Sequence, residues 1–117
     1  MKEWEHQSTL FKWAKQPCIR AKLPELKYLY HIPNGGKRDL IEARHLKEQG
    51  VRPGVPDLHL PVARRGYNSL YIELKTEKGR TTDNQEWWIA ELVKQGNYAV
   101  VCHGWEEARE CLIWYLS

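Results

Sequence analysis

Two acidic residues and a lysine interrupt apolar segments in the middle of the sequence. Asp57 follows Pro56 in VPDLHL, residues 55 to 60, and Glu73 and Lys75 lie within SLYIELKT, residues 69 to 76. Acidic and lysine side chains are rarely buried unless they are paired or bind a metal. Two such interruptions so close together in the sequence predict a single site.

The spacing of these residues indicates metal-assisted chemistry. A strand has a side-chain period of two, which places Glu73 and Lys75 on the same face. If the two apolar segments form a hairpin, Asp57 lies beside Glu73, and the two carboxylates repel each other unless a divalent cation lies between them. Oxygen ligands of this kind suit Mg²⁺ or Mn²⁺. Lys75 can stabilise a developing negative charge or help to position and deprotonate a water molecule.

Gln85 has two interpretations, and the sequence leaves both open. Thr82 and Gln85 have the spacing of a capping box that opens a helix from about residue 83 to 95. Gln85 also lies on the helical stripe that continues through Trp88 and Leu92. A polar residue on that stripe is either a helix cap or a site residue that faces the sheet.

The remaining elements predict an α/β fold in one domain, residues 1–117. Hydrophobic periodicity and turn residues predict helices at about 3–15, 38–49, 83–95 and 105–116, and strands at 27–32, 55–60, 69–76 and 98–102. The order is α-β-α-β-β-α-β-α, with Pro17 limiting the first helix. Because the second and third strands are expected to pair as a hairpin, we predict a mixed four-stranded sheet with helices on both faces.

Composition excludes several classes of protein. The chain is 42% hydrophobic and 28% charged, which indicates a folded domain, and its net charge of +3 permits a polyanionic partner without requiring one. Its three cysteines include no C-x-x-C pair, so we expect reduced thiols in a cytoplasmic protein rather than disulfides or a zinc site. No apolar run reaches the roughly 18 residues of a membrane span, and the segment MKEWEHQ does not resemble a signal peptide.

The motifs together resemble a known nuclease family. They are HIPNGGKR, LKEQGVRPGVPDLHLP, YIELKTEKG and QEWWIAELVKQGNYAVVCHGWEEA, and they extend from near the N-terminus almost to the C-terminus. The PD and ELK segments are similar to the PD-(D/E)xK nuclease superfamily, and the flanking words resemble its VRR-NUC (virus-type replication-repair nuclease) family in the short stand-alone form. The resemblance implies a restriction-endonuclease-like core for the mixed sheet.

The resemblance also implies roles for individual residues. Asp57 and Glu73 would bind the metal, and the backbone carbonyl of Leu74 would join them. Lys75 would support the nucleophilic water, and Gln85 would help to hold Lys75 or that water. Each of these assignments rests on the match between the family motif and this sequence.

A glutamate on the first helix completes the metal shell in the family. Glu3 and Gln7 match the family's E-x-x-x-Q spacing, so Glu3 is the expected ligand. Glu5 is the competing candidate. At ~100° per residue, Glu3 and Glu5 lie roughly 200° apart on the helix, so they are not expected to face the same site.

The resemblance implies a Mg²⁺- or Mn²⁺-dependent endonuclease that acts on structured DNA. The expected substrate is a four-way (Holliday) junction cut by a homodimer, with either Trp87 or Trp88 at the dimer contact. A nicking or flap-type endonuclease and a non-catalytic nucleic-acid-binding module are the alternatives. The setting would be phage-related or DNA repair, inside a bacterial host or a phage-infected cell, with no membrane and no organic cofactor. The expected DNA contacts are Asn34, Lys37, Arg38 and Lys78.

Overall fold

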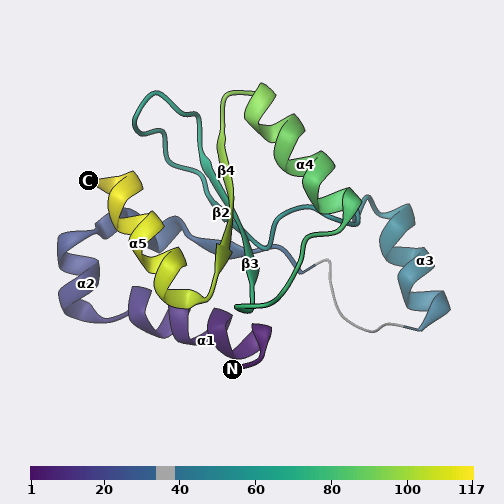
Figure 1. Cartoon of the computed structure of the whole chain (residues 1–117), viewed down its shortest axis with the longest axis horizontal. Coiled ribbons are helices and arrows are strands. Elements are labelled where there is room, and N and C mark those ends of the chain that lie inside the picture. The colour runs from purple at the N-terminus through teal and green to yellow at the C-terminus, as the bar shows by residue number, and fades with distance from the viewer. Residues whose placement is uncertain (34–38) are drawn as a thin grey trace.

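The computed structural model describes residues 1–33 and 39–117 of the chain. Helices, a short 3-10 helix (η1) and strands alternate along these residues (Figure 1). The elements are α1 Glu3–Ala14, α2 Pro17–Lys22, η1 Pro24–Tyr28, β1 Tyr30–His31, α3 Leu40–Glu48, β2 Leu58–Leu60, β3 Leu70–Lys75, α4 Asp83–Lys94, β4 Tyr98–His103 and α5 Trp105–Leu116.

The strands form the mixed sheet that the sequence predicts. Their spatial order is β1-β2-β3-β4, with antiparallel pairing from β1 to β3 and parallel pairing between β3 and β4. The predicted hairpin is confirmed, because β2 and β3 pair with Leu58 opposite Ile72. The parallel step follows from α4, which crosses between β3 and β4 and returns the chain to the starting end of the sheet.

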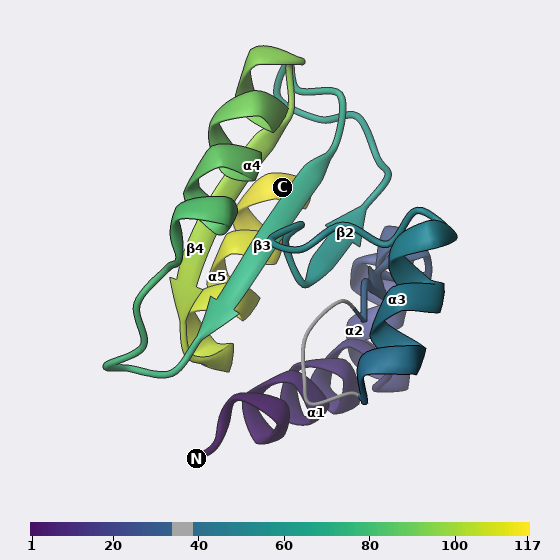
Figure 2. The same cartoon turned by 90° about the vertical axis from the view of Figure 1, so that its right-hand side faces the viewer.

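Helices cover both faces of the sheet, as expected. In Figure 2, α4 lies in front of β4 and α5 lies behind it. The hydrophobic core lies on the α1 and α5 side, where Leu10 and Leu112 meet Ile72 of β3 with exposed fractions of 1% or less. This arrangement buries the apolar side of β3 against α1 and α5. The opposite side, which carries Glu73 and Lys75, faces the first turn of α4, where Gln85 bonds to Glu73.

The central strand is buried on both faces at its C-terminal end. Leu74 is fully buried on the core side, and the neighbouring Glu73 and Lys75 are only 1% and 8% exposed. Buried charges of this kind require partners, because moving a carboxylate or an ammonium group out of water costs about 5 kcal/mol of free energy. The fold therefore concentrates buried charged groups, and the partners that they require, at one end of β3.

The N-terminal third differs in part from the sequence prediction. The segment predicted as a strand, 27–32, contains the end of η1 and the two-residue strand β1, and α2 was not predicted. Both errors have the same physical cause: Pro17 and Pro24 each occupy the start of a helical segment, where the missing N–H group costs nothing. Strand β2 is also shorter than the predicted segment 55–60.

Helix α3 begins two residues later than predicted within the described chain. Asp39 caps it, because the Asp39 carboxylate accepts a hydrogen bond of 2.7 Å from the backbone N–H of Glu42. The aspartate satisfies one of the free N–H groups of the first turn. None of the helices in the described part of the chain combines the length and apolar character that a bilayer span requires.

Candidate functional site

Three carboxylates from distant parts of the sequence converge at the end of β3. Glu3 lies in the first turn of α1, Asp57 directly precedes β2, and Glu73 lies within β3. One carboxylate oxygen from each residue lies within 4.8 Å of those of the other two. This spacing is compatible with three oxygens around one cation, and the sequence-predicted residues are thus brought together.

Asp57 is held in place by the neighbouring strands. Its Oδ2 atom accepts a hydrogen bond of 2.9 Å from the backbone N–H of Leu74. Its backbone carbonyl accepts a bond of 2.6 Å from the N–H of Ile32 and lies 3.0 Å from Nδ1 of His31. One carboxylate oxygen is therefore anchored to β3, and the second oxygen can serve a ligand.

Glu73 is the most strongly perturbed carboxyl group of the site. Its pKa is raised to about 9, first by burial, then by the charge of Asp57 and a hydrogen bond with the Asp57 side chain, with a smaller contribution from the charge of Glu3, while Lys75 opposes the rise. Two carboxyl groups can share a hydrogen bond only when one of them holds a proton. Glu73 is therefore neutral near pH 7 unless added positive charge compensates it, which favours cation binding at this position.

Glu3 experiences the same environment more weakly. Burial and the charge of Asp57 raise the pKa of Glu3, and Lys75 lowers it. Unlike the fully buried Glu73, Glu3 is exposed. The group therefore offers one buried, one half-buried and one exposed carboxylate, with its open side at α1.

Lys75 places an ammonium group beside the carboxylates. Its Nζ atom lies 3.6 Å from Oε2 of Glu73, and its side chain is 10% exposed. The single positive charge compensates only part of the charge of three carboxylates. Lys75 is therefore positioned to interact both with Glu73 and with an anion that enters the site.

Gln85 forms the contacts of a helix cap and also faces the carboxylates, so both positions that the sequence left open apply to it. Its Oε1 atom accepts a 2.9 Å bond from the backbone N–H of Thr82, and Oγ1 of Thr82 accepts a 3.2 Å bond from the backbone N–H of Gln85. The Nε2 atom of Gln85 donates a 3.3 Å bond to Oε2 of Glu73. One side chain thus caps α4 and fixes the orientation of the buried carboxylate.

We expect Gln85→Ala and Thr82→Ala to separate these two functions. Each substitution removes part of the capping box, so each should lower the free energy of unfolding by about 1 kcal/mol. Gln85→Ala alone removes the hydrogen bond to Glu73, so at equal stability only this variant should lose the cleavage activity that the family resemblance implies. Urea denaturation and initial cleavage rates measure the two effects. Equal activity losses in the two variants would contradict the assignment.

The structure separates Glu3 from its competitor Glu5. The Oε1 atom of Glu5 accepts a 2.9 Å bond from the backbone N–H of Lys2, which makes Glu5 a cap for α1. Gln7 is half-buried and lines a pocket of about 450 Å³ that also includes His31. Glu3 is therefore the α1 residue that joins the carboxylate group.

The predicted DNA contacts fall mostly outside the described residues. Asn34, Lys37 and Arg38 belong to this undescribed part, so their placement stays a prediction. Lys78 is exposed and lines a pocket of about 920 Å³ beyond the end of β3, next to His103. This pocket lies at the carboxyl ends of the parallel strands, where ligands of α/β proteins commonly bind.

Other basic residues have intramolecular partners. Arg64 forms a 2.7 Å ion pair with Glu25, and Arg65 donates to the backbone carbonyl of Trp114 while its guanidinium lies 4.4 Å from that indole. These two arginines hold the loop before β3 against η1 and α5. We therefore assign them a structural role.

His31 is a site neighbour that the sequence reasoning missed. Its contact with the backbone of Asp57 arises because β1 pairs with β2, with His31 opposite Leu58. The sequence predicts a strand at 27–32, which contains His31, but it does not show with which strand this segment pairs. Residues 31–33 therefore lie beside residues 55–57 because β1 pairs with β2, and the sequence pattern of either segment alone does not show this pairing.

Comparisons with known proteins agree with this geometry. The family model described as the VRR-NUC domain matches residues 2–106. A solved structure described as a "VRR_NUC domain protein" has a TM-score of 0.84 and 31% sequence identity, and the alignment covers 99% of this chain and 88% of that one. No curated protein matches the chain. The chain therefore belongs to the VRR-NUC domain family and has the fold of a PD-(D/E)xK nuclease.

Proposed function

We propose that the protein is a divalent-metal-dependent endonuclease that hydrolyses phosphodiester bonds in DNA. The observation that supports this most directly is the convergence of Glu3, Asp57 and Glu73 beside the buried Lys75. A structural ion pair would need one acid and one base. Three acids around a single lysine leave an excess of negative charge that a divalent cation would neutralise.

The donor set fits Mg²⁺ or Mn²⁺. Glu3, Asp57 and Glu73 would supply carboxylate oxygens, and the backbone carbonyl of Leu74 would add a neutral oxygen. When bound, the cation would lower the pKa of a coordinated water and polarise the scissile phosphate. The raised pKa of Glu73 is consistent with a group that ionises fully only when a cation is present.

The side chains of this protein would perform the remaining work. Lys75 would donate a hydrogen bond to a phosphate oxygen and stabilise the charge that accumulates during attack. Gln85 would hold Glu73 in one orientation, and the backbone N–H of Leu74 would do the same for Asp57. These contacts exist before substrate binds, so little reorganisation is required during the reaction.

A cleavage panel tests this proposal. The substrates are a four-way junction, a flap, a fork and a linear duplex, each with Mg²⁺, Mn²⁺ or EDTA. We expect metal-dependent cutting, and Lys75→Ala should lower the rate by about 10²- to 10³-fold, because it removes a donor to the developing charge. Lys94→Ala is the matched control, since Lys94 is exposed and pairs only with Glu91 among the ion pairs of the described residues. Equal cutting in EDTA would overturn the metal dependence.

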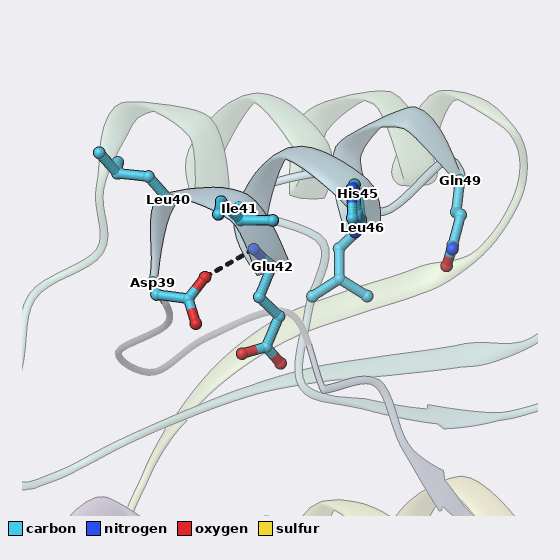
Figure 3. A pocket seen from close by; sticks show the side chains of 7 residues that line it. All are labelled: Asp39, Leu40, Ile41, Glu42, His45, Leu46 and Gln49. Atoms are coloured by element: carbon cyan, nitrogen blue, oxygen red, sulfur yellow. Dashed lines mark hydrogen bonds between the residues drawn. The ribbon is translucent and has the colours of Figure 1, made fainter.

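A homodimer forms the second part of the proposal. Helix α3 lies at the opposite end of the molecule from α2 (Figure 1), and all its residues are exposed except the half-buried Leu46. Leu40 and Ile41 are 89% and 71% exposed, and they line a pocket of about 660 Å³ along α3 (Figure 3). Large apolar side chains that are exposed side by side are candidates for a protein contact.

The two adjacent tryptophans of α4 face in different directions. Trp88 donates a 3.1 Å hydrogen bond to the carbonyl of Pro53 and lines a pocket with Leu46. Trp87 is 57% exposed. We therefore assign Trp87, together with Leu40 and Ile41, to the contact with a second copy of the chain. A two-fold symmetric dimer would present two active sites to two strands of a four-way junction.

The double variant Leu40→Asp/Ile41→Asp should convert the dimer to a monomer, because buried charges destabilise an apolar interface. Light scattering after gel filtration should show the mass fall from twice 13.9 kDa to 13.9 kDa. Ile113→Asp is the control, because Ile113 is a partly exposed residue of α5. A wild-type protein that is already monomeric at high concentration would refute the dimer, and would favour a flap or nicking substrate.

A further inference from the structure

Three aromatic side chains form a row across neighbouring strands. Tyr30 of β1 pairs with His59 of β2, and His59 pairs with Tyr71 of β3. The rings of His59 and Tyr71 stack at 4.1 Å with an interplanar angle of 15°, and Tyr30 meets His59 edge-on at 5.3 Å and 81°. We call these three residues the aromatic row.

A chain of hydrogen bonds fixes the row. Ser69 Oγ donates to Oδ1 of Asn97 at 2.7 Å, so it accepts from Nε2 of His59 at 3.1 Å. The other ring nitrogen, Nδ1, then accepts from the hydroxyl of Tyr30 at 2.7 Å. These contacts hold the imidazole as one tautomer, with Nε2 as the donor and Nδ1 as the acceptor. Both ring nitrogens are satisfied, so His59 is not available as a metal ligand or a general base.

The aromatic row lies directly beside the carboxylates. His59 follows Asp57 by two residues, and Tyr71 precedes Glu73 by two residues. Tyr71 and Glu73 both lie in β3, where a period of two places them on the same face, about 7 Å apart, and Asp57, just before β2, is bonded to β3 through the N–H of Leu74. The row is therefore the next layer of side chains beside the acids, at a distance that the base of a nucleotide attached to the scissile phosphate can reach.

The outer end of the row is accessible. Tyr30 is 47% exposed, and β1 is the edge strand of the sheet. His59 and Tyr71 are half-buried. The hydrogen bond to His59 holds the Tyr30 ring in a defined orientation although nearly half of its surface contacts solvent. A ring that is both exposed and fixed in place can bind a flat ligand with little loss of conformational freedom.

We propose that the aromatic row is a stacking site for an unpaired base of the DNA strand that is cut. The proposal rests on the proposed function, because a base can be placed on the row only if the neighbouring carboxylate site binds a phosphate of the same strand. Nucleobases stack on aromatic side chains without regard to sequence. Because the hydrogen-bonding atoms of His59 are already engaged, the site offers π surface rather than base-specific contacts. It therefore favours DNA with unpaired bases at the cut over intact duplex.

Binding measurements with Tyr30 variants test the stacking site. The probes are a fluorescein-labelled oligothymidylate and a blunt duplex of equal length, in EDTA and in a Glu73→Gln background that prevents cleavage. Tyr30→Leu should weaken single-strand binding by about 5- to 100-fold and leave duplex binding unchanged. Tyr30→Phe and Tyr30→Trp keep an aromatic ring but lose the hydrogen bond to His59, so they should bind single strands better than Tyr30→Leu does. Tyr28→Leu is the control, because Tyr28 is 50% exposed but lies in η1, outside the row.

Each result decides the proposal. Equal losses for single strand and duplex, or no loss for either, would overturn the stacking site. If Tyr30→Leu lowers the melting temperature, the loss of binding in that variant cannot be assigned to the ring, and Tyr30→Trp is compared with the wild-type protein instead. Loss of single-strand binding in a stable Tyr30→Trp protein would then count against stacking. Cleavage by the wild-type protein is measured separately. Its absence would refute the nuclease, whereas unchanged binding by Tyr30→Leu would refute only the stacking site.

Discussion

Asp57→Asn should lower the metal-dependent cleavage rate by at least about 10³-fold. Loss of a residue behind a metal ligand costs about 10- to 100-fold, and loss of one donor to a developing charge costs about 10²- to 10³-fold. Loss of a carboxylate that we propose as a metal ligand should exceed both. The neutral amide oxygen can still accept the hydrogen bond from Leu74 N–H, so the position of the side chain is preserved. Initial rates with Mn²⁺ over a range of metal concentrations measure the loss.

The same substitution should stabilise the metal-free protein. The charge of Asp57 raises the pKa of both Glu3 and Glu73, which means that it destabilises their ionised forms in the folded state. Removing that charge should raise the midpoint of urea denaturation in EDTA. Asp83→Asn is the matched control, because Asp83 is an exposed residue of the first turn of α4. An Asp57→Asn protein that is unfolded, or that cuts at the wild-type rate, would disprove the role of Asp57.

The central part of the fold could be predicted because its sequence pattern is strong. The alternation of β3 places Leu70, Ile72 and Leu74 on one side, and a core at 1% exposure or less receives them. Glu73 and Lys75 on the other side violate the usual preference for buried apolar residues, and the violation itself marks the site. The hairpin of β2 and β3 then brings Asp57 next to β3, as the spacing indicated.

The rest of the site depends on which strands pair and which side chains cap the helices, and neither can be predicted from the sequence pattern of a single segment. The family spacing favours Glu3 over its competitor Glu5, and the structure adds the reason for the difference, because Glu5 bonds to the backbone N–H of Lys2. Strand β1 has two residues, too few to show a period, so the positions of Tyr30 and His31 beside β2 could not be derived. The aromatic row is likewise a product of register between three strands rather than of any single segment.

The stability of the metal-free protein should fall steadily as the pH rises from about 5 to about 9. Glu73 has a folded-state pKa of about 9, against an ordinary value of 4.5, so between these values the folded protein holds a proton that the unfolded chain has lost. Stability therefore decreases with increasing pH in this window, by at most about 1.4 kcal/mol per pH unit for one proton. The contribution is fully present below pH 4.5 and is lost as the pH approaches 9. Urea denaturation in EDTA at a series of pH values measures it.

Metal should reverse this dependence. Because a cation binds the ionised carboxylates, Mn²⁺ should stabilise the protein more at pH 8 than at pH 6, by an amount that grows with metal concentration. Glu73→Gln provides the control, since a glutamine cannot ionise and the metal-free decline should become shallower. If the wild-type and Glu73→Gln proteins lost stability in parallel, the decline would originate elsewhere. If metal stabilised both proteins equally at each pH, then Glu73 would not be one of the ligands.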